Sequence, residues 1–220
     1  MGHRFRTLLL AIMGILALVA AAPSTGMAQI VDSVLVPEGP APASPPDTID
    51  RDVPFVATSH RIVNRMLEVA SVSSTDVVYD LGSGDGRIPI TAAMQHDARG
   101  VGIEIDPDLV AEGRARAKEV GVANQVEFRQ KNLFKADLSE ATVVTLYLWP
   151  EINVELRPKL LQELDPGDRI VSHDFRMGDW EPAKTIRVED STGRATLYLW
   201  KVPEEIPRHL MTTTDELPEN

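Results

Sequence analysis

The sequence predicts an α/β fold, built as a doubly wound, mostly parallel seven-stranded sheet with an antiparallel hairpin at its C-terminal end. Three observations predict it. Strand-forming runs alternate with stretches of helical spacing, a glycine-rich turn joins the first strand to the next helix, and a short turn joins the last two strands. Strands that alternate with helices form parallel sheets with both faces covered.

The individual elements follow from local pattern. A helix is expected over 59–70, where apolar residues recur at helical spacing and Ser59 can cap the first turn. Pro107 suits a helix start and Gly121 a helix end, and the turn around Gly193 joins the final hairpin. The expected strands are 77–81, 100–105, 125–129, 142–148, 169–174, 184–189 and 195–202, and the other expected helices are 87–96, 107–120 and 152–164.

The composition limits the possible functions. A chain of 220 residues with 43% hydrophobic and 25% charged residues is typical of one soluble globular domain with terminal extensions. Its net charge of −11 makes nucleic acid an unfavourable partner, because polyanions are repelled. The absence of cysteine excludes disulfides, thiolate nucleophiles and cysteine-ligated zinc.

The N-terminal segment has the order of a secretory signal. Basic residues among positions 3–6 precede an apolar run over 8–22, and small residues follow up to Ala28. The run has 15 residues. This is fewer than the ~20 needed to span a membrane, so cleavage is favoured over anchoring. We therefore expect an exported or membrane-associated protein, or a cytoplasmic one if translation starts at Met27.

The chain divides into four expected segments. Proline-rich composition predicts an extended linker before the fold, and prolines and acids predict a disordered tail after it. The segments are the signal or apolar segment 1–28, the linker 29–52, the folded domain 53–202 and the tail 203–220.

A glycine-rich loop follows the first strand, with the sequence DLGSGDG over 80–86. Glycines in such a loop let a ligand approach the backbone at the start of the next helix. The spacing departs from the dinucleotide pattern, because the third glycine arrives one residue early. The candidate cofactor residues of this loop are Asp80, Gly82, Ser83, Gly84, Asp85 and Gly86.

The charges of the loop distinguish a dinucleotide from other cofactors better than the spacing of its glycines does. Asp80 and Asp85 would place carboxylates beside the pyrophosphate of a dinucleotide, which costs affinity. A ligand with an ammonium and a sulfonium, such as S-adenosylmethionine (SAM), gains from the same acids. Glu104 ends the second strand, where an acid can accept from both ribose hydroxyls. The sequence thus favours SAM as cofactor.

These motifs resemble those of the class I SAM-dependent methyltransferases, over nearly all of 53–202. DLGSGDG at 80–86 matches the family's first motif, and GIEIDP at 102–107 matches its second. PFVATS at 54–59 and LYLWPEIN at 146–153 are similar to the seven-strand protein-lysine methyltransferases. That group includes the mitochondrial enzymes that act on ATP synthase subunit c and on the adenine nucleotide translocase.

The resemblance implies a role for each matched residue. Asp80, Gly82 and Gly84 would hold the methionine end of SAM, and Glu104 the ribose. Asn132 stands where many relatives have an aspartate that accepts from the adenine amino group, and its amide oxygen can still accept. Ile105 and Leu133 complete the expected cofactor site.

The catalytic candidates follow the fourth and fifth strands, because substrates lie at the carboxyl ends of parallel strands. They are Trp149, Glu151, Asn153 and His173. Three of them also have a structural interpretation. Trp149 can pack in the core, Glu151 can be a helix N-terminal acid, and His173 can be a hydrogen-bonded structural residue.

We therefore expect a SAM-dependent N-methyltransferase that acts on a protein lysine and needs neither a metal nor a covalent nucleophile. The alternatives are a methyltransferase for a small molecule or lipid headgroup, and an exported non-catalytic binding protein on the same fold. The expected partners are a protein or small-molecule substrate and no nucleic acid, with membrane proximity through the N-terminal segment. The oligomeric state stays open.

Overall fold

The computed structural model describes residues 57–190 and 193–213. The predicted signal, the predicted linker and residues 214–220 of the predicted tail lie outside the described residues. In the described part of the chain, no helix combines the length and apolarity that crossing a membrane requires.

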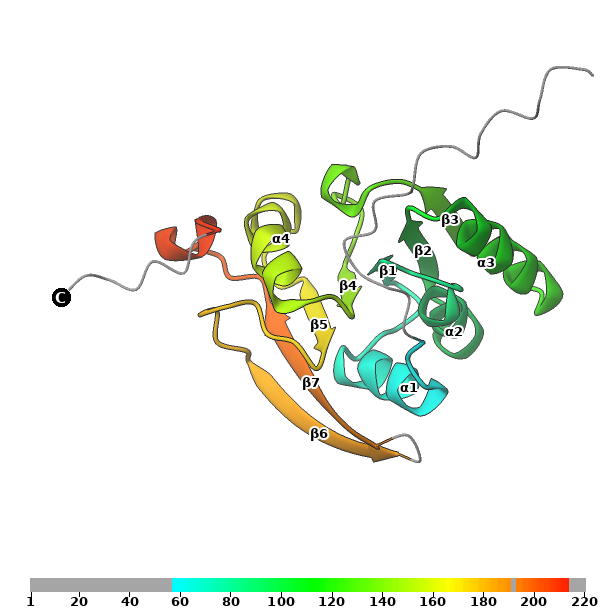
Figure 1. The fold of residues 1–220 in the computed structure, drawn as a ribbon, viewed down its shortest axis with the longest axis horizontal. Coiled ribbons are helices and arrows are strands. Elements are labelled where there is room, and N and C mark those ends of the chain that lie inside the picture. Colours follow the sequence, from blue (N-terminus) through cyan, green and yellow to red (C-terminus); the bar gives the residue numbers. More distant parts are fainter. Residues whose placement is uncertain (1–56, 191–192, 214–220) are drawn as a thin grey trace, which may run out of the picture. The chain divides into compact units, whose positions relative to one another are not determined.

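The sheet has seven strands in the order β3-β2-β1-β4-β5-β7-β6 (Figure 1). The first five strands pair in parallel, and β7 runs antiparallel to both β5 and β6. This confirms the predicted fold class. The strands are β1 (Val77–Leu81), β2 (Arg99–Glu104), β3 (Val126–Gln130), β4 (Val143–Leu146), β5 (Arg169–His173), β6 (Lys184–Asp190) and β7 (Gly193–Lys201).

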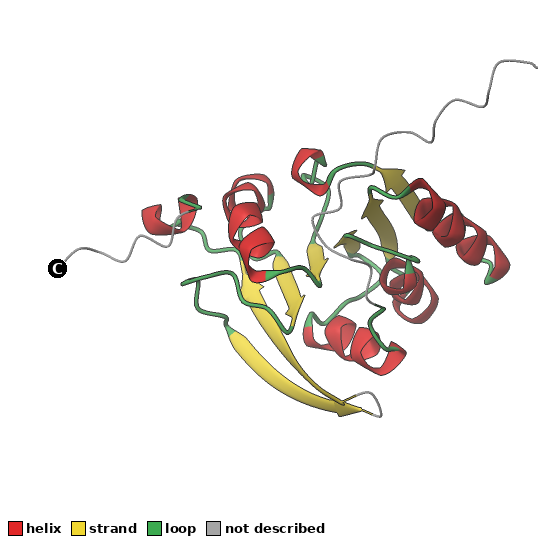
Figure 2. Cartoon of the chain, viewed as in Figure 1, coloured by secondary structure: helices red, strands yellow, loops and turns green. Residues whose placement is uncertain are grey.

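Helices cover both faces of the sheet, as Figure 2 shows. On one face α1, α2 and α3 pack on alternate strand residues such as Val78 and Phe128. On the other face α4 packs on Tyr79 and Leu146. The helices are α1 (His60–Val69), α2 (Arg87–His96), α3 (Pro107–Glu119) and α4 (Pro150–Glu163), with short 3₁₀ helices η1 (Leu133–Lys135) and η2 (Arg208–Met211). Ser59 caps α1 as predicted, accepting from the Ile62 amide.

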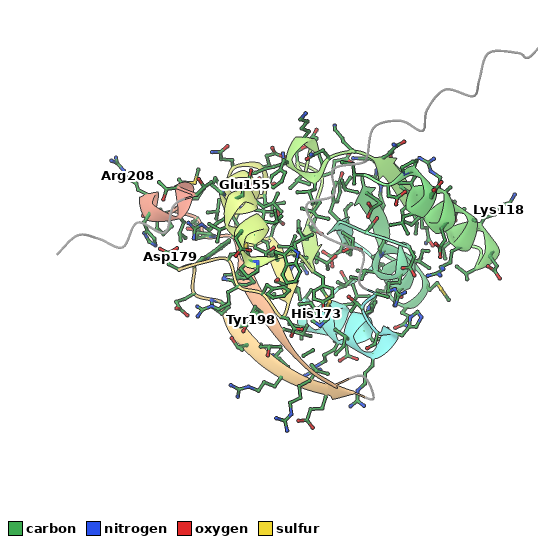
Figure 3. The ribbon with its side chains drawn as sticks, in the orientation of Figure 1. Lys118, Glu155, His173, Asp179, Tyr198 and Arg208 are labelled. Atoms are coloured by element: carbon green, nitrogen blue, oxygen red, sulfur yellow. The ribbon has the colours of Figure 1, made fainter. Side chains whose placement is uncertain are left out.

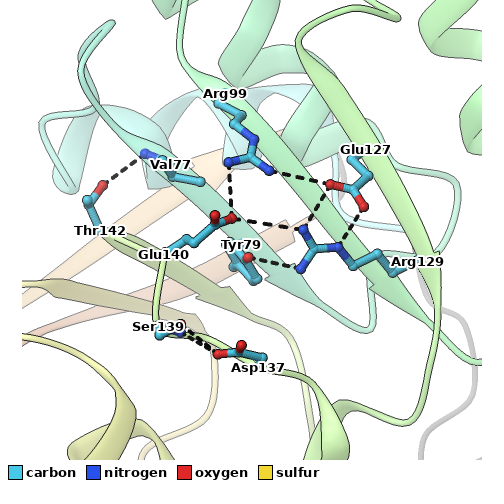
Figure 4. A network of polar contacts seen from close by, with 9 residues as sticks. All are labelled: Val77, Tyr79, Arg99, Glu127, Arg129, Asp137, Ser139, Glu140 and Thr142. Atoms are coloured by element: carbon cyan, nitrogen blue, oxygen red, sulfur yellow. Dashed lines mark hydrogen bonds and ion pairs between the residues drawn. The ribbon is translucent and has the colours of Figure 1, made fainter.

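A charged network lies over β2 and β3, because the connection from β3 to β4 contains only the short η1 (Figure 4). Arg129 donates to the Tyr79 hydroxyl (3.0 Å) and pairs with Glu127. Arg99 joins Glu127 to Glu140, with Nη1 3.1 Å from the latter. These half-exposed pairs cover the ring of Tyr79, whose side chain belongs to the core. Exposed pairs of this kind stabilise only weakly.

Most predicted bounds differ from the observed ones by one or two residues, and two differences bear on the site and on the tail. β4 ends at Leu146, so 147–149 leaves the sheet, and α4 begins at Pro150. The predicted disordered tail is ordered up to residue 213, because Leu210 is buried and the buried guanidinium of Arg157 donates to the Leu210 carbonyl (3.0 Å). The prolines and acids of this segment predict disorder, whereas Leu210 and Met211 pack against the core and order it.

Candidate active site

The candidate site lies where the strand order reverses, between β1 and β4. The chain leaves these neighbouring strands toward opposite faces, which opens a crevice at their carboxyl ends. Asp80 and Thr145 stand opposite each other in the register of the two strands, on the face that carries α2. The loop over 82–86 follows directly.

Asp80 is a buried carboxylate that lacks a cationic partner within the described residues. Its side chain is 4% exposed, and the Thr145 hydroxyl donates to it at 2.7 Å. Burial raises the pKa of Asp80 to about 7 despite this hydrogen bond. A buried anion without a counter-ion is costly, so the site favours a ligand that brings a positive charge.

The carboxylate of Asp85, unlike that of Asp80, has cationic partners. Its carboxylate pairs with Arg87 (2.6 Å) and with Arg116 (2.7 Å). Burial pushes the pKa of Asp85 upward, but the hydrogen bonds from these two arginines bring it below its usual value. The charge of Asp85 is thus balanced inside the protein. It does not reinforce Asp80 in the way that the sequence argument assumed.

Arg87 also ties the start of the described chain to the site. Its Nη1 donates to the carbonyl of Thr58 at 2.5 Å, and the Thr58 hydroxyl lies 3.5 Å from Nδ1 of His173. The segment before α1 therefore contacts the start of α2 and the end of β5.

The loop glycines serve two purposes. Gly82 has a φ of +78°, and a Cβ there would also crowd Leu148 at 3.1 Å. Gly86 meets the ring of Phe128, since a Cβ at this position would lie 2.3 Å from it. Gly86 thus serves internal packing, whereas backbone approach by a ligand is the expectation for Gly82 and Gly84.

Ser83 lies beneath the loop. Its hydroxyl is buried, has no hydrogen-bond partner in the described residues, and points toward Gly102 on β2. A serine fits this position because a larger side chain would collide with the strand.

Glu104 fastens the loop to the end of β2. Its carboxylate accepts from the amides of Gly84 (2.8 Å), Ile105 (2.9 Å) and Asp106 (3.0 Å). A carboxylate offers about four acceptor positions, so roughly one remains for a ribose hydroxyl. The side chain both shapes the loop and keeps capacity for a ligand.

Asn132 and Leu133 lie at the end of β3. The Asn132 side chain caps η1, accepting from the Phe134 amide at 2.9 Å. Leu133 packs, partly buried, against the core beneath α4. Asn132 therefore has a local structural role, and its oxygen retains a second acceptor position for a ligand.

Four rings form an aromatic wall, which we define as His173, Tyr147, Phe175 and Trp149. The ring of Tyr147 stacks on His173 with centroids 3.9 Å apart, and Phe175 lies 5.5 Å from Trp149. Burial raises the pKa of Tyr147. His173, labelled in Figure 3, is buried, whereas Trp149 is 43% exposed. The wall thus runs from the interior to the surface.

Asn153 and Glu151 start α4 next to this wall. Asn153 is fully buried, and its amide group donates to Ser172 (3.3 Å) and to the Phe175 carbonyl (3.4 Å). Asn153 therefore positions the loop that carries Phe175. Glu151 is exposed in the first helical turn, where the helix dipole favours an acid.

Sequence reasoning missed three residues of this site. Thr145 lies within an apolar strand, and only its register opposite Asp80 shows its role. Phe175 follows His173 by two positions, which could have been noticed as an aromatic residue after the fifth strand. Arg87 appears from the sequence as an exposed helix residue, and only the structure shows that it bridges Asp85 and Thr58.

The comparisons with known proteins agree with this geometry. Residues 80–184 match the family model described as the ANTKMT methyltransferase domain. A protein-lysine N-methyltransferase of Saccharolobus islandicus is 46% identical over 153 residues, 69% of this chain and 95% of that protein. The chain belongs to the ANTKMT methyltransferase domain family. The resemblance inferred from its motifs is confirmed.

Two further relatives give the range of this family. The adenine nucleotide translocase lysine N-methyltransferase of Mus musculus is 32% identical, over 84% of this chain and 79% of that protein. A crystal structure described as an RNA methyltransferase from Salinibacter ruber in complex with S-adenosyl-L-homocysteine is 61% identical, with a TM-score of 0.67. The match covers 70% of the present chain and 99% of the chain in that crystal structure.

The protein is a SAM-dependent methyltransferase, and its residues fit that cofactor. Asp80, which has no cationic partner in the part of the chain that the structure describes, would hold the ammonium of the amino-acid end, while Glu104 keeps an acceptor for the ribose. Gly82 and Gly84 would line the same end. Among the described residues, no group of three or more His, Asp and Glu is placed to hold a metal ion.

Proposed function

We propose that this methyltransferase modifies a lysine side-chain nitrogen of a protein. The observation that carries the proposal is the aromatic wall, which reaches the surface at the ends of β4 and β5 beside the cofactor residues. Flat rings hold the methylenes of a lysine and attract its ammonium. The relatives named as lysine N-methyltransferases support the same substrate class.

The residues of the site have separate roles in this proposal. SAM supplies an electrophilic methyl group carried by a sulfonium. Asp80 and Glu104 orient the cofactor, and the partly exposed Trp149 and Phe175 guide the lysine chain toward the crevice. An amine must be neutral and aligned before it attacks, so the wall's task is to orient it and exclude water.

His173, Asn153 and Glu151 take supporting roles in this proposal. His173 is stacked on Tyr147 and lies beside Thr58, so it shapes the buried end of the wall. Asn153 positions Phe175 through the backbone. Glu151 is exposed near Trp149, where its charge attracts an approaching ammonium.

An RNA acceptor is a second candidate, because a 61% identical relative is described as an RNA methyltransferase. The net charge of −11 favours the protein substrate, since it opposes the approach of a polyanion. Aromatic rings alone do not distinguish a lysine acceptor from an RNA acceptor, because such rings also stack on nucleic-acid bases.

Labelling decides between these acceptors. Purified protein is incubated with SAM that carries a tritiated methyl group and with extract of its own cells, and portions are then treated with protease or with ribonuclease. We expect protease-sensitive label that is recovered as methyl-lysine after acid hydrolysis. Ribonuclease-sensitive label, or label extractable as a small molecule or lipid, would refute the lysine acceptor. The variant Asp80→Asn provides the background.

We further propose that residues 1–28 direct export or membrane association. The support is the sequence order of basic, apolar and small residues. Fractionation of a C-terminally tagged protein, followed by N-terminal sequencing, tests this. A cytosolic protein that begins at Met27 would refute it.

A further inference from the structure

A charged groove runs between α1 and β6, outside the crevice at the carboxyl ends of β1 and β4. Its walls carry His60, Arg61, Arg65 and Glu68 from α1, and Arg187 and Glu189 from β6. All six side chains belong to exposed residues. Figure 1 shows α1 beside the β6–β7 hairpin. Neither the methyl transfer nor the core explains this arrangement of charges.

The groove carries an excess of positive charge. Glu68 pairs with Arg65 at 2.8 Å, and Glu189 pairs with Arg194 at 2.9 Å. Arg61 and Arg187 have no ion pair within the described residues. Two cationic side chains thus remain on opposite walls of one groove, in a protein whose net charge is −11. Such a local field attracts anionic groups.

The groove begins close to the aromatic wall. His60 is the first residue of α1, and Thr58, two positions earlier, lies against His173. From His60 to Glu68 the helix rises about 12 Å, at ~1.5 Å per residue. An extended peptide covers that length with about four residues. A peptide that lies in the groove therefore ends beside the buried end of the wall, and a few more residues bring a lysine to the exposed end at Trp149.

We propose that this groove binds an acidic segment of the protein substrate, a few residues from the methylated lysine. The inference rests on the proposed lysine acceptor and adds a determinant of substrate choice. Two or more Asp or Glu side chains, separated along an extended peptide, would meet Arg61 and Arg187. Guanidinium groups pair well with carboxylates.

A peptide fits the groove better than an RNA strand does. Glu68 and Glu189 stand among the arginines, so evenly spaced phosphates would meet carboxylates as well as cations. A peptide can place neutral residues at those points. Of the groove's arginines, only Arg61 and Arg187 have no ion pair within the described residues, which is few for a polyanion that the whole protein repels.

Binding measurements on the full chain test the proposal. The probes are labelled peptides of about twelve residues with one Lys and a block of Glu, the matching Gln peptides, and an oligouridylate of similar length. Wild type is compared with Arg61→Gln/Arg187→Gln. The control Lys118→Gln/Arg208→Gln removes the same charge from exposed residues of α3 and η2, which are labelled in Figure 3.

We expect the Glu peptide to bind about tenfold more tightly than the Gln peptide, and the groove variant to lose most of that preference. The control should change affinity about twofold or less, as loss of distant charge does at moderate salt. Equal losses in both variants would overturn the proposal, because net charge alone would explain them. Tighter RNA binding that depends on Arg61 and Arg187 would also overturn it.

Methylation of the same peptides separates this proposal from the proposed function. In the groove variant we expect a higher KM for the Glu peptide, with kcat unchanged, and no change for the Gln peptide. No methylation of either peptide, with the binding preference intact, would contradict the lysine acceptor alone. Equal methylation of both peptides by wild type would contradict the groove alone.

Discussion

Three buried aspartates near β1 have different environments, and only one is available to a ligand. Asp76 pairs with Arg169, and although burial opposes it, this hydrogen bond helps to lower the pKa of Asp76 to about 2. Asp85 is balanced by its two arginines. Among the described residues, only the Thr145 hydroxyl donates a hydrogen bond to the Asp80 side chain, and burial raises the pKa of Asp80 to about 7. The lack of a cationic partner within the described residues distinguishes Asp80, the expected cofactor residue, from Asp76 and Asp85.

The first prediction concerns Asp80→Asn. The change keeps the shape but removes a charge-assisted hydrogen bond, so SAM and S-adenosylhomocysteine should bind more weakly by about 1.5 to 3 kcal/mol. Isothermal titration calorimetry measures the loss. Asp108→Asn, on the exposed first turn of α3, is the control and should bind as wild type does. Unchanged affinity in Asp80→Asn would contradict the site.

The second prediction concerns pH. The pKa of Asp80 is about 7 in the folded protein and 3.8 is its ordinary value, so folding takes up a proton between these values and stability falls as pH rises through that window. A cationic ligand needs the charged form. Affinity for SAM should therefore rise by about tenfold per pH unit below 7 and level off above it.

The pH experiment is limited to values below about 7.5, where an α-amino group stays protonated. Asp80→Asn should abolish most of the slope. A slope that persists in this variant would assign the proton to another group. Release of a proton on binding, measured by calorimetry in two buffers, is the independent readout.

At the scale of elements, one aromatic ring organises the packing of α2 and α3 on β2 and β3. Phe128 is buried where Gly86, Gly102 and Gly113 leave space for it. A Cβ on any of the three would lie within 3 Å of the ring. The glycines of this region thus permit close approach of helix and strand, which is a role separate from cofactor binding.

The third prediction concerns Gly113→Ala. In an ordinary helix the change stabilises by about 1 kcal/mol, but here the new methyl would lie 2.8 Å from Phe128. We expect a net loss of about 1 to 3 kcal/mol in the free energy of unfolding. Chemical denaturation measures it. Phe128→Leu in the same chain should recover part of the loss, which a double-mutant cycle quantifies.

The control for this helix is Ala111→Gly, at an exposed position of α3. It should cost about 1 kcal/mol through backbone entropy alone. A stabilising Gly113→Ala would show that the ring moves aside, and would contradict the packing role.

At the scale of the whole molecule, Arg157 joins parts of the chain that are far apart in sequence. Its fully buried guanidinium donates to the carbonyls of Met177 (3.1 Å), Leu210 (3.0 Å) and Thr212 (2.7 Å), and pairs with Asp179. It thereby holds the loop after β5 and the C-terminal segment against α4. The same loop carries Phe175 of the aromatic wall.

The fourth prediction concerns Arg157→Lys. One ammonium cannot reach all four acceptors, and buried carbonyls would lose their donors, so we expect a loss of about 3 kcal/mol in stability. Limited proteolysis should then cut first within 203–213. Lys159→Arg, two residues further along the same helix, is the control and should leave the cleavage pattern unchanged.

The strand and helix pattern could be predicted closely from the sequence, because each element has its own periodicity. The positions of Asp80, Gly82, Gly84 and Glu104 at strand ends could be predicted as well, since they lie in two short motifs, and their contacts with SAM stay a prediction. The ion-pair partners of the charged residues could not be predicted from the sequence. The pairing of Asp85 with Arg116 joins residues that are 31 positions apart.

The alternation of apolar runs, the glycine loop and the acids at strand ends determined the fold class and the cofactor, because these properties reside in short stretches of chain. Only the tertiary structure decided which acid lacks a cation, which rings form a wall, and that η2 docks on Arg157. Electrostatic balance and packing are properties of neighbours in space. They depend on which distant residues the sheet brings together.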